Sequence, residues 1–128
     1  MITKKWDKTD RFDADDYNRI KNNTQTVVDL FNVSNEFFVD TIPLTADKTY
    51  NDFVYADEIN DITDDLELIG KCIGYPLDFE KHNENDRFLI AAELNKIEEA
   101  HSPLEELLTN KNESRNHLKI QLGDRGGL

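Results

Sequence analysis

The sequence predicts a mainly α-helical protein. Three stretches of the 128-residue chain carry apolar residues at steps of three and four, which places them on one face of a helix. Most of the prolines and glycines fall between or after these stretches. We expect three amphipathic helices at about 14–37, 55–70 and 87–101, a short helix at 103–110, extended segments that begin with Pro-Leu, and a short strand at 117–122.

The ends of the first two helices carry recognisable signals. Asp13 can accept hydrogen bonds from the free backbone N–H groups of the first turn, and Phe12 and Tyr17 on either side of it can pack together. The second helix should stop at Gly70 or Gly74, because glycine readily ends a helix. The first helix therefore has a well-defined start, and the second a well-defined end.

The third helix should be interrupted by proline. Ser102 and Pro103 are typical of a helix start, so a short new helix is expected from there to about residue 110. The run from His117 to Leu122 resembles a strand, and the glycine-rich end that follows should fray. These features predict one small helical domain at 1–116 and a strand-like segment with a flexible tail at 117–128.

The sequence pattern of the helices indicates a repeated unit. Residues 53–62 and 88–97 match without a gap in Phe, Ala, Glu, Asn and Ile, and residues 12–20 fit the same frame if one residue is dropped. Pro43-Leu and Pro76-Leu precede two of these helices. The alternative is that any capped amphipathic helix resembles any other.

An asparagine occupies the same place in each unit. Asn18, Asn60 and Asn95 each lie between two apolar core positions, where helix propensity would not favour asparagine. An amide at the edge of a core can bond both a backbone N–H and a C=O of an extended segment that crosses the helix. The segments around Trp6, Pro43 and Pro76 are candidates for this crossing; the alternative is that these asparagines are solvated.

The charge restricts the partners. The chain has 27 acidic and 15 basic residues, and residues 22–70 hold eleven acids and one base. Such a surface does not grip nucleic acid or anionic lipid directly. No apolar run approaches the ~20 residues that a membrane span needs, and the first residues do not resemble a signal peptide, so we expect synthesis in the cytoplasm of the cell that makes the chain.

The sequence does not point to catalysis. The neighbouring acids are expected to be solvated, among them Asp13, Asp15 and Asp16, Asp64 and Asp65, and Glu98 and Glu99. No loop has calcium-ligand spacing, the histidines are far apart, and Cys72 is the only cysteine. We therefore expect no enzyme activity, metal, cofactor or small-molecule substrate.

Residues 6–23 resemble a segment of known proteins. Trp6 followed by TDRFDADDYNRIKNN at residues 9–23 is similar to a segment of tail and baseplate-region virion proteins of phages that infect Gram-positive bacteria. Lys21 stands where these proteins usually have Glu, and no receptor-binding or collagen-like stretch follows. The resemblance implies a structural protein of the virion.

Two functions follow as hypotheses. The first is a virion assembly protein of the tail, baseplate or connector region, which associates with other virion proteins and with itself, as a small up-and-down bundle or a sheath. Its contacts would use the aromatic residues Trp6, Phe12, Tyr17, Phe37 and Phe38, unless these close the core of the monomer. The alternative is an acidic regulator that mimics nucleic acid in a partner's basic groove, through Asp57, Glu58, Asp61, Asp64, Asp65 and Glu67.

Overall fold

The computed structural model describes residues 1–34, 40–49, 54, 56–83 and 91–124. This part of the chain folds into three helices, α1 (Ala14–Ser34), α2 (Ala56–Ile73) and α3 (Ala91–Asp124), and contains no strand. The predicted mainly α-helical class is therefore confirmed. Residues 35–37 and 87–90, at the expected ends of the first and third helices, lie outside the described residues.

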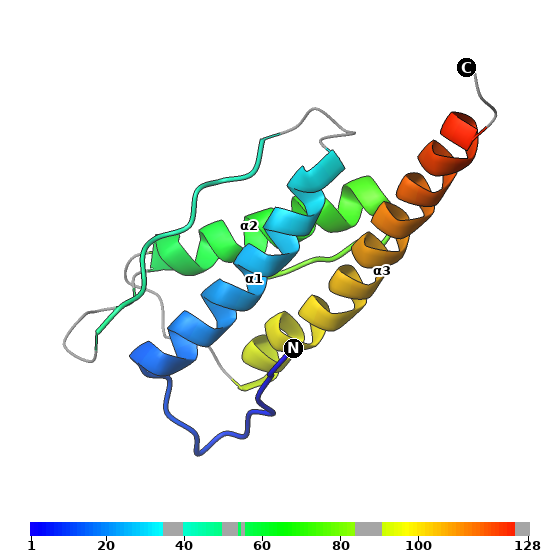
Figure 1. Ribbon diagram of the computed structural model, residues 1–128. Coiled ribbons are helices and arrows are strands. Elements are labelled where there is room, and N and C mark those ends of the chain that lie inside the picture. The colour runs from blue at the N-terminus through cyan, green and yellow to red at the C-terminus, as the bar shows by residue number, and fades with distance from the viewer. Residues whose placement is uncertain (35–39, 50–53, 55, 84–90, 125–128) are drawn as a thin grey trace.

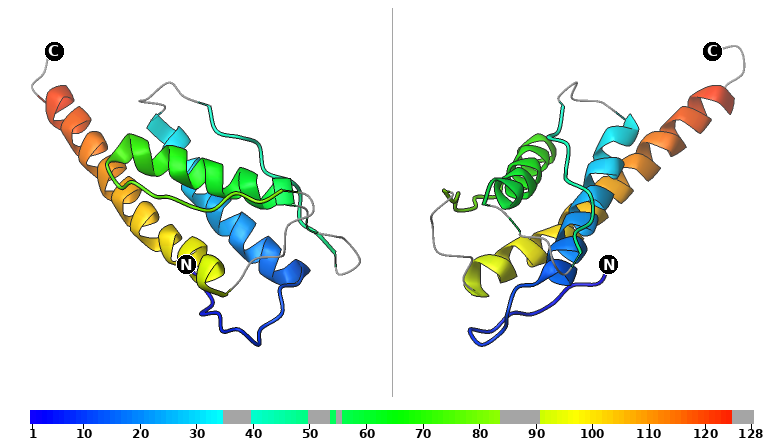
Figure 2. Two further views of the ribbon diagram at one scale, coloured as in Figure 1. Left: turned by 180° about the vertical axis from the view of Figure 1, so that it is seen from behind. Right: turned by 90° about the vertical axis from the view of Figure 1, so that its left-hand side faces the viewer.

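All three helices run in roughly the same direction, so the expected up-and-down arrangement is wrong (Figures 1 and 2). A parallel arrangement requires connections that return along the bundle. The 21 residues of α1 span about 31 Å, a distance that about ten extended residues can cover. Residues 35–55 and 74–90 are each long enough for this return.

The predicted cap of α1 and one of the two predicted stops of α2 are present. The Asp16 N–H donates to Asp13 Oδ1 at 3.0 Å, and the Asp13 N–H donates to Asp16 Oδ2 at 3.2 Å, which satisfies two backbone donors at the helix start. Helix α2 continues past Gly70 and ends before Gly74, whose φ of 82° is readily accessible only to glycine. The Tyr75 N–H then donates to the Gly70 carbonyl at 2.8 Å, as in a Schellman motif.

Helix α3 corrects two predictions. It runs without interruption through Pro103, so there is no separate helix at 103–110, and it includes residues 117–122, so the predicted strand is wrong. Proline removes only one backbone hydrogen bond, and the buried Ala100 and Leu104 on either side of Pro103 keep both halves in one packed stripe. The alternating apolar residues after His117 instead extend a helix that is already nucleated.

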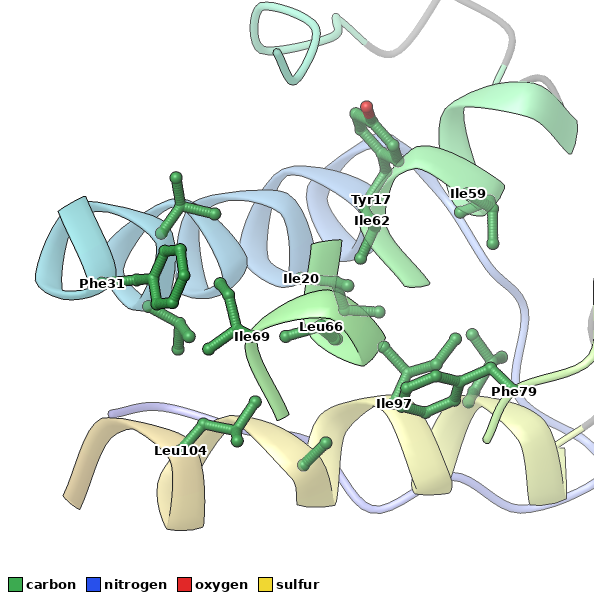
Figure 3. Close-up of a cluster of buried hydrophobic side chains, with 14 of the residues drawn as sticks. Tyr17, Ile20, Phe31, Ile59, Ile62, Leu66, Ile69, Phe79, Ile97 and Leu104 are labelled. Atoms are coloured by element: carbon green, nitrogen blue, oxygen red, sulfur yellow. The ribbon is translucent and has the colours of Figure 1, made fainter. Parts of the chain in front are cut away.

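The core is built from equivalent positions of the three units (Figure 3). Each helix packs against the other two. Aligned on Asn18, Asn60 and Asn95, the helices contribute buried residues in sets of three, each side chain at most 3% exposed: Tyr17, Ile59 and Leu94; Ile20, Ile62 and Ile97; Thr24, Leu66 and His101; Val27, Ile69 and Leu104. The units are thus related by an approximate threefold arrangement.

Candidate association site

The expected two-bond contact of the asparagines is present in the structure. Asn18 Nδ2 donates to the Lys48 carbonyl, and the Lys48 N–H donates to Asn18 Oδ1, both at 2.7 Å. Asn60 holds His82 in the same way, with distances of 2.7 Å from Nδ2 to the carbonyl and 3.0 Å from the backbone nitrogen to Oδ1. Each amide thereby replaces the hydrogen bonds that an extended backbone would otherwise make with water.

The third asparagine joins the first unit to the last. The Trp6 N–H donates to Asn95 Oδ1 at 2.6 Å, and Asn95 Nδ2 donates to the Trp6 carbonyl at 3.0 Å. The segment before each helix is therefore held by another helix in cyclic order: the first by α3, the second by α1 and the third by α2. We call residues 2–6, 40–49 and 75–83 the first, second and third crossing segments.

Each crossing segment also contacts the helix that follows it. In the first, the Ile2 carbonyl accepts a bond of 2.7 Å from Asn23 Nδ2 of α1. In the second, Lys48 Nζ lies 2.9 Å from Glu58 Oε2 of α2. In the third, His82 Nε2 lies 2.9 Å from Glu93 Oε2 of α3. Every segment thus bridges two parallel helices.

The Trp6 side chain enters a polar site under the first segment. The side chain is buried, and its Nε1 donates to Glu98 Oε2 at 2.7 Å. The Lys4 N–H donates to the same oxygen at 3.0 Å, and Arg19 Nε donates to Glu98 Oε1 at 2.8 Å. Glu98 is only 1% exposed, so this carboxylate exchanges water for three protein donors. We call Arg19, Asn95 and Glu98 the Trp6 site.

A second carboxylate, that of Asp16, also pairs with the arginine. Arg19 Nη1 donates to Asp16 Oδ1 at 2.9 Å, and Lys4 Nζ lies 3.7 Å from that oxygen. Burial raises the pKa of Asp16, but the hydrogen bonds from Arg19 and Asp13 lower it by more than burial raises it. The pKa of Asp16 therefore lies below the ordinary value. Burial lowers the pKa of Arg19, while its bonds to Glu98 and Asp16 raise it above the ordinary value. Both groups therefore stay charged at neutral pH.

Two further buried groups carry altered pKa values. Asp65 is fully buried; its Oδ1 accepts a 2.6 Å bond from the Ile42 N–H, and its Oδ2 has no hydrogen-bond partner among the described residues. Burial raises the pKa of Asp65 to about 6. His101 is also fully buried, with Nε2 at 2.8 Å from Thr24 Oγ1, and burial lowers its pKa to about 4. Asp65 and His101 are thus titratable groups buried where a helix packs against another part of the chain.

Of the five aromatic residues proposed for an interface, Trp6 and Tyr17 are buried in the folded monomer. Trp6 and Tyr17 are 4% and 1% exposed, so for these two the alternative holds that they close the monomer core. Phe12 is half-buried, with its ring centroid 5.8 Å from that of Trp6. Phe37 and Phe38 lie outside the described residues.

The acidic residues proposed to mimic nucleic acid do not form a common exposed face. Glu58 and Asp65 are buried, and Glu58 pairs with Lys48. Lys81 Nζ lies 2.8 Å from Asp64 Oδ1 and 3.1 Å from Glu67 Oε1. The structure also corrects the prediction that the acidic pairs are solvated, because one member of each is buried: Asp16, Asp65 and Glu98.

The described residues show neither a metal-binding cluster nor a membrane-spanning helix. Within the described ranges, no group of three or more His, Cys, Asp or Glu side chains is arranged to hold a metal ion. None of the helices in this part of the chain is both long and apolar enough to cross a membrane. His82, which the sequence left without an acidic partner, pairs with Glu93.

Sequence reasoning missed the polar half of the Trp6 site. Glu98 follows Ile97 on the inner stripe of its helix, three residues after Asn95, so its position in the repeat was a usable signal. Arg19 gave no such signal, because its partner Glu98 lies 79 residues away in the sequence. Comparison of the chain with family models, curated proteins and solved structures found no match.

Proposed function

We propose that this chain is a structural protein of a phage particle, in the tail, baseplate or connector region, and that it acts by protein–protein association. The observation that carries the proposal is the way the chain binds its own crossing segments. An amide on one helix holds an extended backbone, and a neighbouring parallel helix holds the other side of the segment. Such a contact needs no continuous chain between its partners, so it works equally well between molecules.

The shape of α3 supports the same proposal. Its C-terminal part extends past the ends of α1 and α2 (Figures 1 and 2). Asn112 Nδ2 donates to the Leu30 carbonyl at 3.1 Å near the end of α1, and α3 continues for twelve residues beyond Asn112. A helix that leaves its own bundle offers surface to other virion proteins or to a second copy.

The resemblance of residues 6–23 to phage virion proteins supplies the biological setting. In this structure the same residues comprise Trp6 at the end of the first crossing segment, the turn that follows it and the first half of α1. The part of the sequence that resembles virion proteins thus includes Trp6, which joins the first unit to the last. This coincidence favours an association module over a catalytic one.

Analysis of purified particles tests the proposal. Particles of the phage that encodes the chain would be banded in a density gradient and their proteins identified from peptide masses. We expect peptides of this chain at a fixed ratio to a tail protein. If the chain is abundant in infected cells but absent from particles, the proposal is wrong.

The salt dependence of partner binding tests the acidic-regulator alternative. A regulator that occupies a basic groove would bind its partner through charge, and that binding would weaken steeply with added salt. Association through the crossing segments rests mainly on hydrogen bonds to backbone and on the buried Trp6, so it should weaken much less with added salt.

A further inference from the structure

The contact made by the first crossing segment differs from the other two in how the chain connects it. The second and third segments each join two helices that are consecutive in the sequence, so the chain itself keeps them close to their asparagines. Trp6 and Asn95 are 89 residues apart, and they join the first unit to the last. This contact is therefore the one that the chain connection does least to enforce.

The turn after Trp6 is built from exposed polar groups. Asp7 Oδ1 accepts hydrogen bonds from the Thr9 N–H at 2.8 Å and from the Thr9 hydroxyl at 2.6 Å. The Asp7 N–H donates to Asp10 Oδ2 at 2.9 Å, and the Asp10 N–H returns a bond of 3.1 Å to the Asp7 carbonyl. All three residues are exposed, so opening the turn uncovers no core residue.

Charge also matches the first segment to its site. Residues 1–6 contain two lysines and no acid, although the whole chain carries a net charge of −12. Lys4 lies beside Asp16 and donates its backbone N–H to Glu98. Lys4 Nζ lies over the Trp6 ring, 4.0 Å from its centroid, in a cation–π contact. The segment is thus a basic extended stretch with one aromatic anchor, and its backbone and Lys4 face the carboxylates of Glu98 and Asp16, which also pair with Arg19.

We propose that two copies of this chain exchange their first crossing segments. Trp6 of each copy occupies the Trp6 site of the other, with the same hydrogen bonds to Asn95 and Glu98 as within one chain. The exchange keeps every contact of the closed monomer and opens only the turn at residues 7–10, which is the requirement for a swapped dimer. This inference rests on the proposed function in that it names a second copy as a partner.

Mixing two full-length variants tests the exchange, because Trp6 is the sole tryptophan. The first variant, Trp6→Ala, keeps the site but has no tryptophan. The second, Asn95→Ala with Glu98→Gln, keeps Trp6 but has a damaged site. We expect the second variant alone to show the long-wavelength emission of an exposed indole. Adding the first should shift the emission to shorter wavelengths and produce a species of twice the 14.9 kDa mass of one chain.

The controls separate exchange from other effects. A triple variant, Trp6→Ala with Asn95→Ala and Glu98→Gln, offers no intact site and should cause no shift. If Trp6→Ala does not fold, Trp6→Phe replaces it, because Phe fills part of the site without tryptophan emission.

Two results overturn the proposal. One is that the emission of the second variant stays unchanged at every concentration of the first. The other is that its tryptophan is already buried in isolation, since the site would then not depend on Asn95 and Glu98. Either result leaves the presence of the chain in particles as a separate question, answered by the particle analysis.

Discussion

Asn95 and Trp6 form two hydrogen bonds that close the ring of three units. The asparagine side chain accepts from the Trp6 N–H at 2.6 Å and donates to the Trp6 carbonyl at 3.0 Å. The same pair of bonds joins Asn18 to Lys48 and Asn60 to His82. One residue type at one helix position therefore organises the whole fold, and its removal is the most direct test of the structure.

Replacing any of the three asparagines by alanine should destabilise the protein by about 1–3 kcal/mol, because a backbone N–H and C=O lose their partner. Urea unfolding measures the change. Asn95→Ala should also shift the emission of Trp6 to longer wavelengths, whereas Asn18→Ala should not. Asn110→Ala, at an exposed position of α3, is the matched control and should cost little. Equal stability of Asn60→Ala and Asn110→Ala would contradict the contact.

Glu98→Gln should lower the free energy of unfolding by about 2–4 kcal/mol. The three partners of this carboxylate, Trp6 Nε1, the Lys4 N–H and Arg19 Nε, are all donors, and a glutamine offers them only one oxygen while turning an NH2 group toward the others. Arg19 also loses one of its two carboxylates. Thermal unfolding gives the change. Glu99→Gln alters the exposed neighbour and should leave the midpoint nearly unchanged; a similar loss in both variants would argue against the Trp6 site.

Asp65→Asn should stabilise the protein near neutral pH. The pKa of Asp65 is about 6 in the folded protein and 3.8 ordinarily, so the folded state binds the proton more tightly and loses stability as the pH rises from about 4 to 6. The asparagine carries no charge and can still accept the Ile42 N–H. We expect a gain of roughly 1–3 kcal/mol at pH 7 and none at pH 4, measured by urea unfolding. Asp57→Asn, at an exposed position of α2, should show no such dependence.

His101→Leu should remove a loss of stability in acid. The pKa of His101 is about 4 in the folded protein and 6.5 ordinarily, so the unfolded chain takes up a proton first, and folding weakens as the pH falls from 6.5 to 4. Leucine already occupies the equivalent position of the second unit as Leu66. Thr24 keeps its bond to the Ile20 carbonyl, so no donor is orphaned. A variant with the same acid sensitivity as the parent chain would show that the histidine is not its source.

The sequence predicted most of what depends on local pattern. Apolar spacing located all three helices, and the cap at Asp13 and the stop at Gly74 follow from the conformations those residues favour. The asparagines could be predicted because helix propensity does not explain them. The prediction of a break at Pro103 was wrong, since a proline ends a helix only where packing does not hold the two halves together.

The direction of the helices and the Trp6 site could not be predicted. An amphipathic pattern buries the same face whether its helix runs up or down, so periodicity does not distinguish parallel from antiparallel packing. Glu98 has an acidic neighbour, Glu99, and such pairs are usually solvated. Its burial depends on Arg19 and Trp6, which contact it from 79 and 92 residues away in the sequence.

The common direction of the helices gives the molecule an electrical polarity. In an antiparallel bundle the dipoles of neighbouring helices oppose each other, but here all three add, with positive poles at the end where the helices begin. Five acidic residues occupy the first turns at that end: Asp15, Asp16, Asp57, Glu58 and Glu93. The last turns of α1 and α3 carry no basic residue, so the opposite poles have little compensation there. The two ends of the bundle are electrostatically distinct, and end-to-end stacking of copies would bring unlike poles together.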